Sequence, residues 1–290
     1  MSDLLNAHTE ALVRALPHIQ RYQEKTLVVK YGGNAMINPE LKAGVIQDMV
    51  FLTSVGIRVI LVHGGGPEID ALLKALGKES RFVQGLRYTD EETMDAVQMV
   101  LCGRVNKDIT GLVQQAGGRA LGLCGVDMGL FTATRLRLDG EDIGLVGEIV
   151  SVNAEFLETL LDAGIIPVIS SVAQGIGEDV GRTLNINADT AAAHIAVAVG
   201  AETLLLMTDV PGLLRDVADS ASRIDRLSLS ELAALTQEGV ISKGMIPKTE
   251  CCALAIEGGV EQAHILDGRL PHSLLAALFT DQSIGTIISE

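Results

Sequence analysis

The sequence Val-His-Gly-Gly-Gly-Pro at residues 62–67 combines residue types that can hold an anion. Aliphatic residues before it predict a buried strand, and Pro67 suits the first turn of a helix after it. Only glycine lets the backbone approach a bulky anion with no side chain in between. The free N–H groups and the partial positive charge at the start of that helix favour the same ligand. We therefore interpret residues 62–67 as an anion-binding turn.

Two lysines lie beside other glycine-containing turns. Lys30 ends a predicted strand at 26–30 and precedes Gly32 and Gly33, while Lys248 opens a predicted helix after Lys-Gly-Met-Ile-Pro. A lysine at the start of a helix is unfavourable with the helix dipole, which prefers an anion there. Either lysine alone could be an exposed surface residue. Two of them facing one cleft would favour a functional role.

The sequence Asn-Ile-Asn-Ala-Asp at residues 185–189 leads into an alanine-rich helix. Asp189 by itself could be the N-cap of that helix. In an extended segment, however, Asn185, Asn187 and Asp189 would point to the same side, which favours a ligand-binding face. Arg87, in a Gly-Leu-Arg-Tyr-Thr turn, could bind a carboxylate through its planar guanidinium, or could be an ordinary surface arginine.

Other polar residues give weaker signals. His63 could be a base, but no Ser or Asp partner follows it, and a packed histidine at a strand end is the better interpretation. No Ser/His/Asp or Cys/His constellation is evident. Asp209, in Thr-Asp-Val-Pro-Gly after a predicted strand, could contact a ribose hydroxyl or simply stabilise the turn. The standard P-loop and dinucleotide fingerprints are absent.

Composition excludes several classes of partner. The formal net charge of −15 counts against nucleic acids and anionic membranes, since both require a basic face. The sequence has neither an apolar run of membrane length nor a signal peptide, so we expect a cytoplasmic protein. The cysteines lack metal-ligand spacing, and we interpret them as reduced structural thiols. They are Cys102, Cys124, Cys251 and Cys252.

The order of predicted elements indicates an α/β fold, a three-layer αβα sandwich with a central, mainly parallel sheet, preceded by an N-terminal helix. Two consecutive strand–glycine–helix units begin such a sheet with right-handed crossovers. Ligands gather at the carboxyl ends of its strands, where both glycine turns lie. The chain divides into the N-terminal helix at 1–24, a lobe at 25–195 and a lobe at 196–290, all within one continuous domain.

Three further segments carry specific expectations. Helical spacing over 3–22 predicts a helix that Pro17 kinks or splits, and this helix could pack on another subunit or dock on its own chain. A long helix is predicted at 91–115, with Thr89 or Asp90 as its cap. Residues 173–183, which contain three glycines and few apolar residues, are predicted to form a loop.

Taken together, these motifs resemble the amino acid kinase family. The match is carried by Val-Val-Lys-Tyr-Gly-Gly-Asn-Ala-Met at 28–36, Val-His-Gly-Gly-Gly-Pro-Glu-Ile at 62–69, Gln-Gly-Leu-Arg at 84–87, Asn-Ile-Asn-Ala-Asp at 185–189, Thr-Asp-Val-Pro-Gly at 208–212 and Gly-Met-Ile-Pro-Lys at 244–248. The resemblance extends from about residue 4 to the end of the chain. No single motif is specific, but their order is.

The resemblance implies transfer of the γ-phosphoryl group of ATP, bound with Mg²⁺, to the side-chain carboxylate of N-acetyl-L-glutamate in arginine biosynthesis. In the family pattern, Lys30 and Lys248 stabilise the transition state and Asp189 holds both lysines. The lobe at 25–195 then binds the acid through Gly65, Gly66, Arg87 and Asn185. The lobe at 196–290 binds the nucleotide, with the nucleotide site formed by Gly32, Gly33, Asp209, Val210, Pro211, Gly212, Leu213, Leu214, Val240, Ile241 and Ser242. No protein ligand set for a metal is expected.

The N-terminal helix and the segment at 264–273 resemble a hexameric, arginine-inhibited branch of the family, built as a trimer of dimers. Ala277 stands where such members usually carry Glu, and Ser283 where a glycine is usual. A missing carboxylate weakens a site for a guanidinium, so we expect weak or absent inhibition by arginine. A PII-type nitrogen-signalling protein is a known partner of some relatives in this branch.

Two alternatives remain open. The substrate could be a related acid, such as an aminoadipate derivative, aspartate or carbamate. Arg87 with Asn185 fits an α-carboxylate and an N-acyl group, which counts against carbamate, but side-chain length cannot be inferred from these residues. The chain could also be a non-catalytic amino-acid sensor. Loss of Lys30, Lys248 or Asp189 would mark such a sensor, and all three are present.

Overall fold

An eight-stranded sheet lies at the centre of the computed structural model, which describes residues 2–138, 141–241, 244–280 and 284–290. The strands are β1 (Thr26–Tyr31), β2 (Arg58–His63), β5 (Ala120–Cys124), β8 (Ile166–Ser170), β11 (Thr203–Thr208), β12 (Arg226–Ser228), β13 (Gln262–Asp267) and β14 (Thr286–Ser289). Their order is β12-β14-β13-β11-β1-β2-β8-β5. Neighbours are parallel except β13 and β14, which are antiparallel. Strands such as β11, buried along their whole length, supply the aliphatic core.

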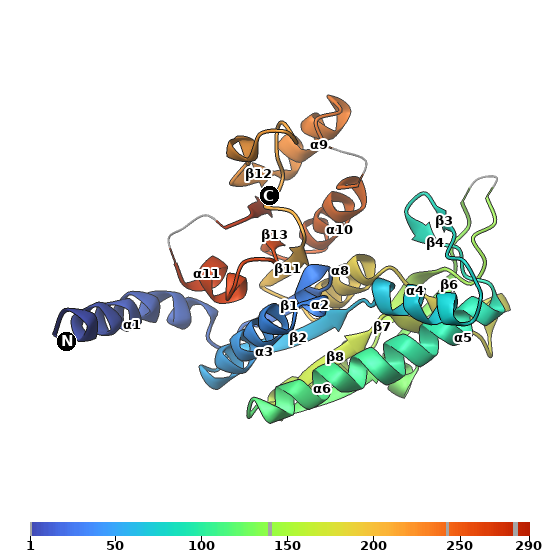
Figure 1. The fold of residues 1–290 in the computed structure, drawn as a ribbon, viewed down its shortest axis with the longest axis horizontal. Helices are drawn as coiled ribbons and strands as arrows, with labels where there is room; N and C mark the ends of the chain where they lie inside the picture. Colours follow the sequence, from blue (N-terminus) through green and yellow to red (C-terminus); the bar gives the residue numbers. More distant parts are fainter. Residues whose placement is uncertain (1, 139–140, 242–243, 281–283) are drawn as a thin grey trace.

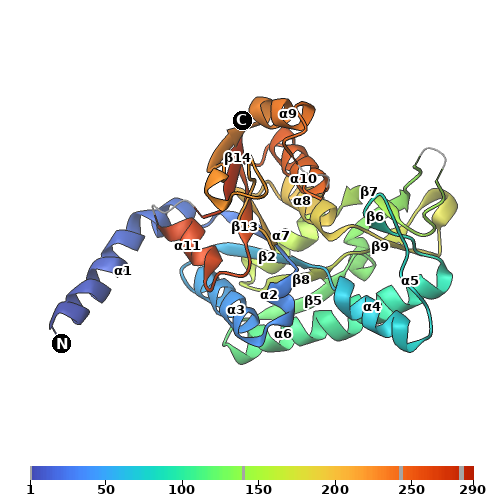
Figure 2. The same cartoon turned by 45° about the horizontal axis from the view of Figure 1, so that its top comes forward.

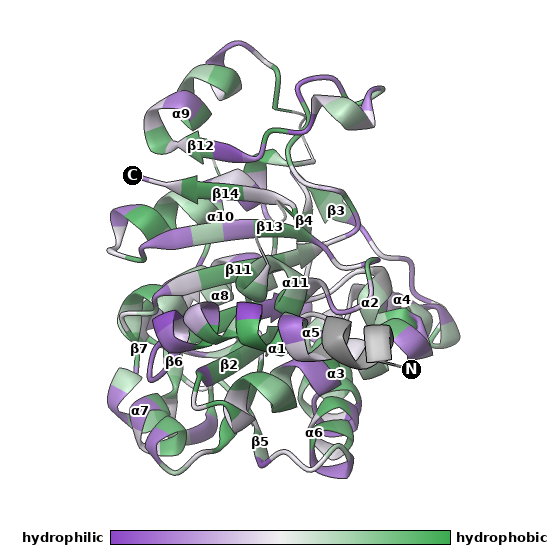
Figure 3. Ribbon diagram, turned by 90° about the vertical axis from the view of Figure 1, so that its left-hand side faces the viewer, coloured by the Kyte–Doolittle hydropathy of each residue, from purple (hydrophilic) through white to green (hydrophobic). Residues whose placement is uncertain are grey.

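Helices cover both faces of this sheet. Figure 3 shows one layer formed by α3 (Pro39–Ser54), α6 (Asn106–Gln115) and α11 (Ser273–Phe279). The opposite layer contains α7 (Ala154–Asp162), α8 (Ala188–Ala198) and α10 (Ile246–Glu257). Other helices include the short α2 (Asn34–Ile37), α4 (Gly66–Ala75) after the second glycine turn, and α9 (Leu229–Gln237) near the C-terminal edge of the sheet (Figure 2). The predicted three-layer sandwich is therefore confirmed, whereas the division into lobes near residue 195 stays a prediction.

A second, four-stranded sheet adjoins the first, with the order β10-β9-β6-β7. It consists of β6 (Phe131–Arg135), β7 (Gly147–Val152), β9 (Val172–Gly175) and β10 (Thr183–Asn185). The loop predicted at 173–183 is thus wrong, because its two ends pair as antiparallel strands around a 3₁₀ turn at Gly177–Asp179. Cross-strand pairing, which local periodicity does not reveal, orders this glycine-rich segment.

The helix predicted at 91–115 is one helical run with a change of winding in its middle. It starts as α5 (Glu91–Gln98), becomes the π-helix η1 (Met99–Val105) and continues as α6. Asp90 is the N-cap, because its side chain accepts a hydrogen bond from Thr93 N. A π-helical turn adds a residue per turn and often marks a functional region.

Helix α1 (Ser2–Tyr22) extends away from the body of the molecule (Figure 1). It remains a single helix across Pro17, so the predicted splitting at this proline is wrong. Leu12, Val13 and Leu16 are 70%, 64% and 51% exposed, which leaves an apolar surface on the protruding helix. Among the described helices, none combines the length and the apolar character needed to cross a membrane.

Candidate active site

The predicted site residues meet where parallel strands end. Strand β1 pairs with β2 and with β11, so that Lys30 lies in register with Val62 and Leu206. Each of these strands is followed by a turn that was singled out in the sequence. Because the carboxyl ends of parallel strands share one edge of the sheet, the first glycine turn, the second glycine turn and the Thr-Asp-Val-Pro-Gly turn are brought together.

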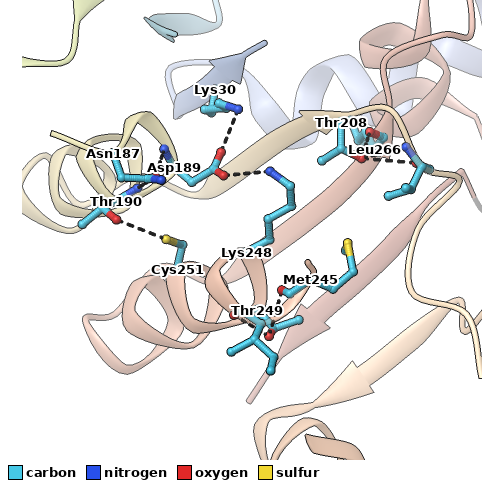
Figure 4. A network of polar contacts seen from close by, with 12 residues as sticks. Lys30, Asn187, Asp189, Thr190, Thr208, Met245, Lys248, Thr249, Cys251 and Leu266 are labelled. Atoms are coloured by element: carbon cyan, nitrogen blue, oxygen red, sulfur yellow. Dashed lines mark hydrogen bonds and ion pairs between the residues drawn. The ribbon is translucent and has the colours of Figure 1, made fainter. Parts of the chain in front are cut away.

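Asp189 binds both candidate lysines (Figure 4). Its Oδ1 lies 2.9 Å from Lys30 Nζ, and its Oδ2 accepts a hydrogen bond of 2.8 Å from Lys248 Nζ. The contact with Lys30 is an ion pair without the geometry of a hydrogen bond. Burial alone would raise the pKa of Asp189, but the two lysines hold it well below its usual value. The carboxylate is therefore ionised, and the three side chains carry a net charge of +1.

Local structure explains how Asp189 comes to be buried. The cap of α8 is Asn187, whose Oδ1 accepts hydrogen bonds from Asp189 N and Thr190 N. Asp189 is therefore free to point toward the lysines, and its interpretation as the N-cap is wrong. The extended polar face expected at 185–189 is also wrong, since the chain turns from β10 into α8 within these residues.

The two lysines line a cavity of about 300 Å³. Among its described lining residues are Lys30, Gly33, Met207, Thr208, Asp209, Val210, Gly244, Met245 and Lys248. A Cβ added to Gly33, which has φ = 71°, would lie 2.5 Å from Asp209 Oδ1, and one added to Gly32 would lie 2.8 Å from Lys30 Nζ. Gly33 is thus required by its left-handed backbone conformation and by the crowding of Asp209, whereas a Cβ at Gly32 would require a shift of the Lys30 ammonium group.

Several predicted nucleotide-site residues lie outside this lining. Leu213 is buried, and its N–H donates to Thr286 Oγ1. Ile241 is buried as well, while Ser242 lies outside the described residues. The others in this group are Gly32, Pro211, Gly212, Leu214 and Val240, none of which is among the described residues that line the cavity. Their assignment to the nucleotide site stays a prediction.

All the predicted acid-binding residues line a second cavity, of about 200 Å³. They are Gly65, Gly66, Arg87 and Asn185. Ala188 also lines this cavity, and a Cβ added to Gly64 would lie 3.7 Å from Ala188 Cβ. The glycine turn therefore packs directly on the start of α8, one residue before the carboxylate that holds the lysines.

Arg87 is fixed in place around this second cavity. Its side chain is only 8% exposed, its Nη1 contacts Asp70 Oδ1 at 2.5 Å and Ser80 Oγ at 2.6 Å, and its guanidinium lies 4.8 Å from the centre of the Phe82 ring. Its Nη2 lies 3.3 Å from Gly66 O. These contacts exclude the ordinary surface arginine. Asn185 is oriented in turn, since its Nδ2 donates to Thr89 Oγ1 at 3.1 Å.

Sequence reasoning did not assign some of the residues that line the two cavities. Met207, Gly244 and Met245 line the larger one and lie within or beside the motifs, so adjacency could have indicated them. Leu101 and Ser171 line the smaller one. Leu101 belongs to the π-helical segment, and no local signal in the sequence marks it as a cavity residue.

The described residues do not include a cluster of three or more His, Cys, Asp or Glu side chains that could hold a metal ion. Asp209 is the carboxylate among the described residues lining the larger cavity. A single carboxylate beside two lysines suits a Mg²⁺ ion that is held mainly by phosphate oxygens and water. The cysteines are free thiols, as expected.

Comparison with known proteins gives a family match over most of the chain. Residues 25–267 match the amino acid kinase family. The chain is 52% identical over 283 residues to an acetylglutamate kinase of Clostridium kluyveri, covering 98% of this chain and 99% of that one. It is 53% identical over 279 residues to an acetylglutamate kinase of Nostoc sp., covering 96% of this chain and 92% of that one.

Solved structures share the fold. An N-acetylglutamate synthase from Neisseria gonorrhoeae, complexed with coenzyme A and N-acetyl-glutamate, superposes with a TM-score of 0.86 at 28% identity. The match covers 97% of this chain but only 63% of that one. A carbamate kinase of Giardia, with a TM-score of 0.64 at 16% identity, covers 91% of this chain and 98% of that one and supports the fold alone. From the family match and these full-length relatives, we conclude that the chain belongs to the amino acid kinase family.

Proposed function

We propose that this chain transfers the γ-phosphoryl group of ATP to the side-chain carboxylate of N-acetyl-L-glutamate, the second step of arginine biosynthesis. The observation that supports it most is the position of Asp189. Its neighbour Ala188 lines the smaller cavity, while its carboxylate holds the two lysines that line the larger one. A group passing between the cavities therefore passes two fixed positive charges. The relatives named acetylglutamate kinase support the same substrate.

In this proposal, the smaller cavity binds the acid. Arg87 presents a guanidinium to the α-carboxylate, a pairing with strong geometric preference. Asn185 supplies an amide for the N-acyl group. Gly65 and Gly66 supply backbone N–H groups at the start of α4, where the helix dipole favours an anion. The side-chain carboxylate of the acid then faces the lysines.

The chemistry needs position and positive potential rather than a protein nucleophile. A carboxylate oxygen of the acid forms a bond to the γ-phosphorus, the bond to the bridging oxygen breaks, and its electron pair stays on ADP. Charge spreads over the oxygens of the transferred group on the way. Lys30 and Lys248 stabilise that charge, and Asp189 holds them before the substrate arrives. A carboxylate is already ionised at neutral pH, so no general base is required.

The larger cavity binds the nucleotide in this proposal. Gly32 and Gly33 let the phosphates approach the backbone, and Asp209 with Val210 forms one wall. The assignment of the surrounding segments at 211–214 and 240–242 rests on the resemblance to the family. Mg²⁺ would enter with ATP near Asp209, where it would neutralise part of the phosphate charge.

The decisive experiment measures ADP release by the purified protein. We expect release that depends on both ATP and N-acetyl-L-glutamate, with trapping of the acyl phosphate by hydroxylamine. N-acetyl-L-aspartate and N-acetyl-L-aminoadipate, one methylene shorter and longer, test the length of the acid. ADP release that is independent of N-acetyl-L-glutamate, or faster with either homologue, would contradict the proposed substrate.

We propose that the chain assembles through α1 and works in the cytoplasm. The protruding α1 with its exposed leucines supports assembly through this helix, and the resemblance specifies a hexamer formed as a trimer of dimers. A cytoplasmic location suits an enzyme with free cysteines and an ATP-dependent biosynthetic reaction. A PII-type regulator would be a further partner of the same assembly.

A further inference from the structure

His63 lies directly before the glycine turn and is completely buried. Its Nδ1 is 2.8 Å from Gly64 O, and its Nε2 is 3.1 Å from Asn106 Nδ2. The mechanism proposed above does not use this ring. Its two contacts nevertheless connect the glycine turn to Asn106, which lies in the helical run at 91–115.

These contacts determine which nitrogen of His63 carries the proton. A carbonyl oxygen can only accept, so Nδ1 must donate to Gly64 O. The amide of Asn106 has its nitrogen toward the ring, because Nδ2 also lies 2.8 Å from Val168 O while Lys107 Nζ donates to Oδ1 at 3.0 Å. Nε2 therefore accepts from Asn106. The ring is neutral, consistent with burial and the nearby Lys107 charge lowering its pKa to about 4.

The hydrogen bond to Gly64 O has a consequence for Gly65. A trans peptide is planar, so its C=O and the following N–H point in opposite directions. When His63 holds Gly64 O on the side of the buried ring, Gly65 N–H is directed away from it. Gly65 lines the smaller cavity, and no described residue accepts a hydrogen bond from its N–H. That donor is available to a ligand.

The π-helical segment η1 packs against the same glycine turn. A Cβ on Gly65 would lie 2.7 Å from Leu101 Cδ2 and 3.3 Å from Val105 Cγ2. Asn106, which fixes the ring of His63, follows Val105 directly. One helical run therefore packs against the glycine turn and also fixes the tautomer of His63.

We propose that His63 is a positioning residue, which orients the peptide between Gly64 and Gly65 so that Gly65 N–H faces the acid substrate, with Asn106 fixing its tautomer. This inference rests on the proposed function for the identity of the acid. The geometry of the ring stands independently of it.

The test compares three variants by steady-state kinetics. His63→Leu removes the donor, and we expect kcat/KM for N-acetyl-L-glutamate to fall at least tenfold while KM for ATP changes less than twofold. His63→Asn places an amide N–H near the position of Nδ1, and we expect it to recover most of that loss. His264→Leu is the matched control, because His264 is also a buried strand histidine but lines neither cavity. We expect it to leave both KM values unchanged.

A spectroscopic measurement keeps the inference testable if a variant fails to fold. In the wild-type protein labelled with ¹⁵N-histidine, the His63 ring must show the Nδ1–H tautomer and must not titrate between pH 5.5 and 8. An Nε2–H tautomer, a titration in that range, or a His63→Leu enzyme with unchanged kcat/KM overturns the proposal. An equal loss in His63→Leu and His63→Asn would do the same. If the wild-type enzyme is inactive with N-acetyl-L-glutamate, the proposed function fails, while the tautomer still tests the geometry.

Discussion

Asp189 and its two lysines concentrate the positive charge of the site in a few side chains. The whole chain carries −15, so the field that attracts two anionic substrates has to be local. Lys30 and Lys248 are 11% and 23% exposed, and Asp189 is 8% exposed. In such partly dry surroundings a fixed charge acts more strongly than it does in water. Catalysis at this scale depends on a small number of preorganised groups.

Removing either lysine should therefore reduce turnover strongly. Replacing Lys30 or Lys248 by alanine takes away one preorganised charge, which typically costs roughly 3–4 kcal/mol of transition-state stabilisation. We expect kcat to fall by about two orders of magnitude or more, with an unchanged circular dichroism spectrum. Lys25→Ala is the control, because Lys25 forms only a half-exposed pair with Glu202. Turnover near that of the wild type in either site variant would be incompatible with the assigned roles.

Gly65 should be equally sensitive to substitution, for a steric reason. Its φ of 163° lies outside the left-handed region, so the argument concerns the space around the residue. Gly65→Ala would force a methyl group against buried Leu101 and move the turn. We expect kcat/KM for N-acetyl-L-glutamate to fall at least tenfold with little change in KM for ATP. Gly103→Ala, in the same helical run and with open space around it, should behave as the wild type; comparable losses in both would contradict the steric argument.

At the scale of elements, a buried side-chain contact joins α3 to the start of α11. Its N-cap residue His272 provides no side-chain hydrogen bond to the helix. Instead, Asp48 of α3, which is completely buried, lies 2.6 Å from His272 Nδ1 at the start of α11. A carboxylate at this end of a helix also interacts well with its dipole. The pair of Asp48 and His272 thus connects α3 to the start of α11.

Asp48→Ala should destabilise the protein even though Asp48 lines neither cavity. The variant leaves His272 Nδ1 without its buried partner and removes the carboxylate near the start of α11, at a cost of about 2 kcal/mol in the free energy of unfolding. Urea denaturation measures this loss. Asp108→Ala is the comparison, since Asp108 forms a partly exposed ion pair with Lys42 of the same α3, and we expect less than about 0.5 kcal/mol there. A similar change in both variants would argue against a structural role for the pair of Asp48 and His272.

The elements also show what sequence reasoning could reach. Strands β1, β2 and β11 are short aliphatic runs that end at glycine or Thr-Asp turns, and their parallel arrangement follows from strand–helix alternation. The gathering of Lys30, the turn at 62–67 and the turn at 208–212 at one edge could therefore be anticipated. The strands at 172–175 and 183–185 could not, because their order comes from pairing between distant segments. The π-helical winding of η1 has no signature in helical periodicity either.

For the molecule as a whole, two buried histidines make stability depend on pH. Burial lowers the pKa of His63 and of His264 from 6.5 to about 4. Between these values the unfolded chain binds more protons than the folded one, so stability is complete above pH 6.5 and is lost toward pH 4. Each ring accounts for about 3 kcal/mol. Asp48, whose pKa burial raises, opposes this trend.

Thermal unfolding at pH 7.5 and pH 5 measures the effect. We expect the midpoint of the wild type to fall as the pH is lowered through this window. The double variant His63→Asn with His264→Gln, which cannot protonate at these positions, should lose less. An equal fall in both proteins would show that other groups determine the acid sensitivity.

Assembly also belongs to this scale. Leu12 and Leu16 are exposed on α1, which extends from the body of the molecule (Figure 1). We expect the double variant Leu12→Glu with Leu16→Glu to have a lower mass by light scattering than the wild type while keeping its kinase activity. An unchanged mass would exclude this face of α1 from assembly.

In the same samples we expect arginine to inhibit weakly or not at all, since Ala277 provides no carboxylate; a steep inhibition curve at sub-millimolar arginine would refute this.

The shared sheet has a consequence for motion. Strands β1 and β11 lie on opposite sides of the predicted lobe boundary but pair directly, from Leu27 with Thr203 to Lys30 with Leu206. The connection from α8 to β11 is tied down as well, because Glu202 N donates to Thr26 O. A rotation between the halves therefore has to be absorbed as a change of sheet twist at this pairing. Under the proposed function, an opening that releases product would have to change this twist, because residues of both strands line the larger cavity.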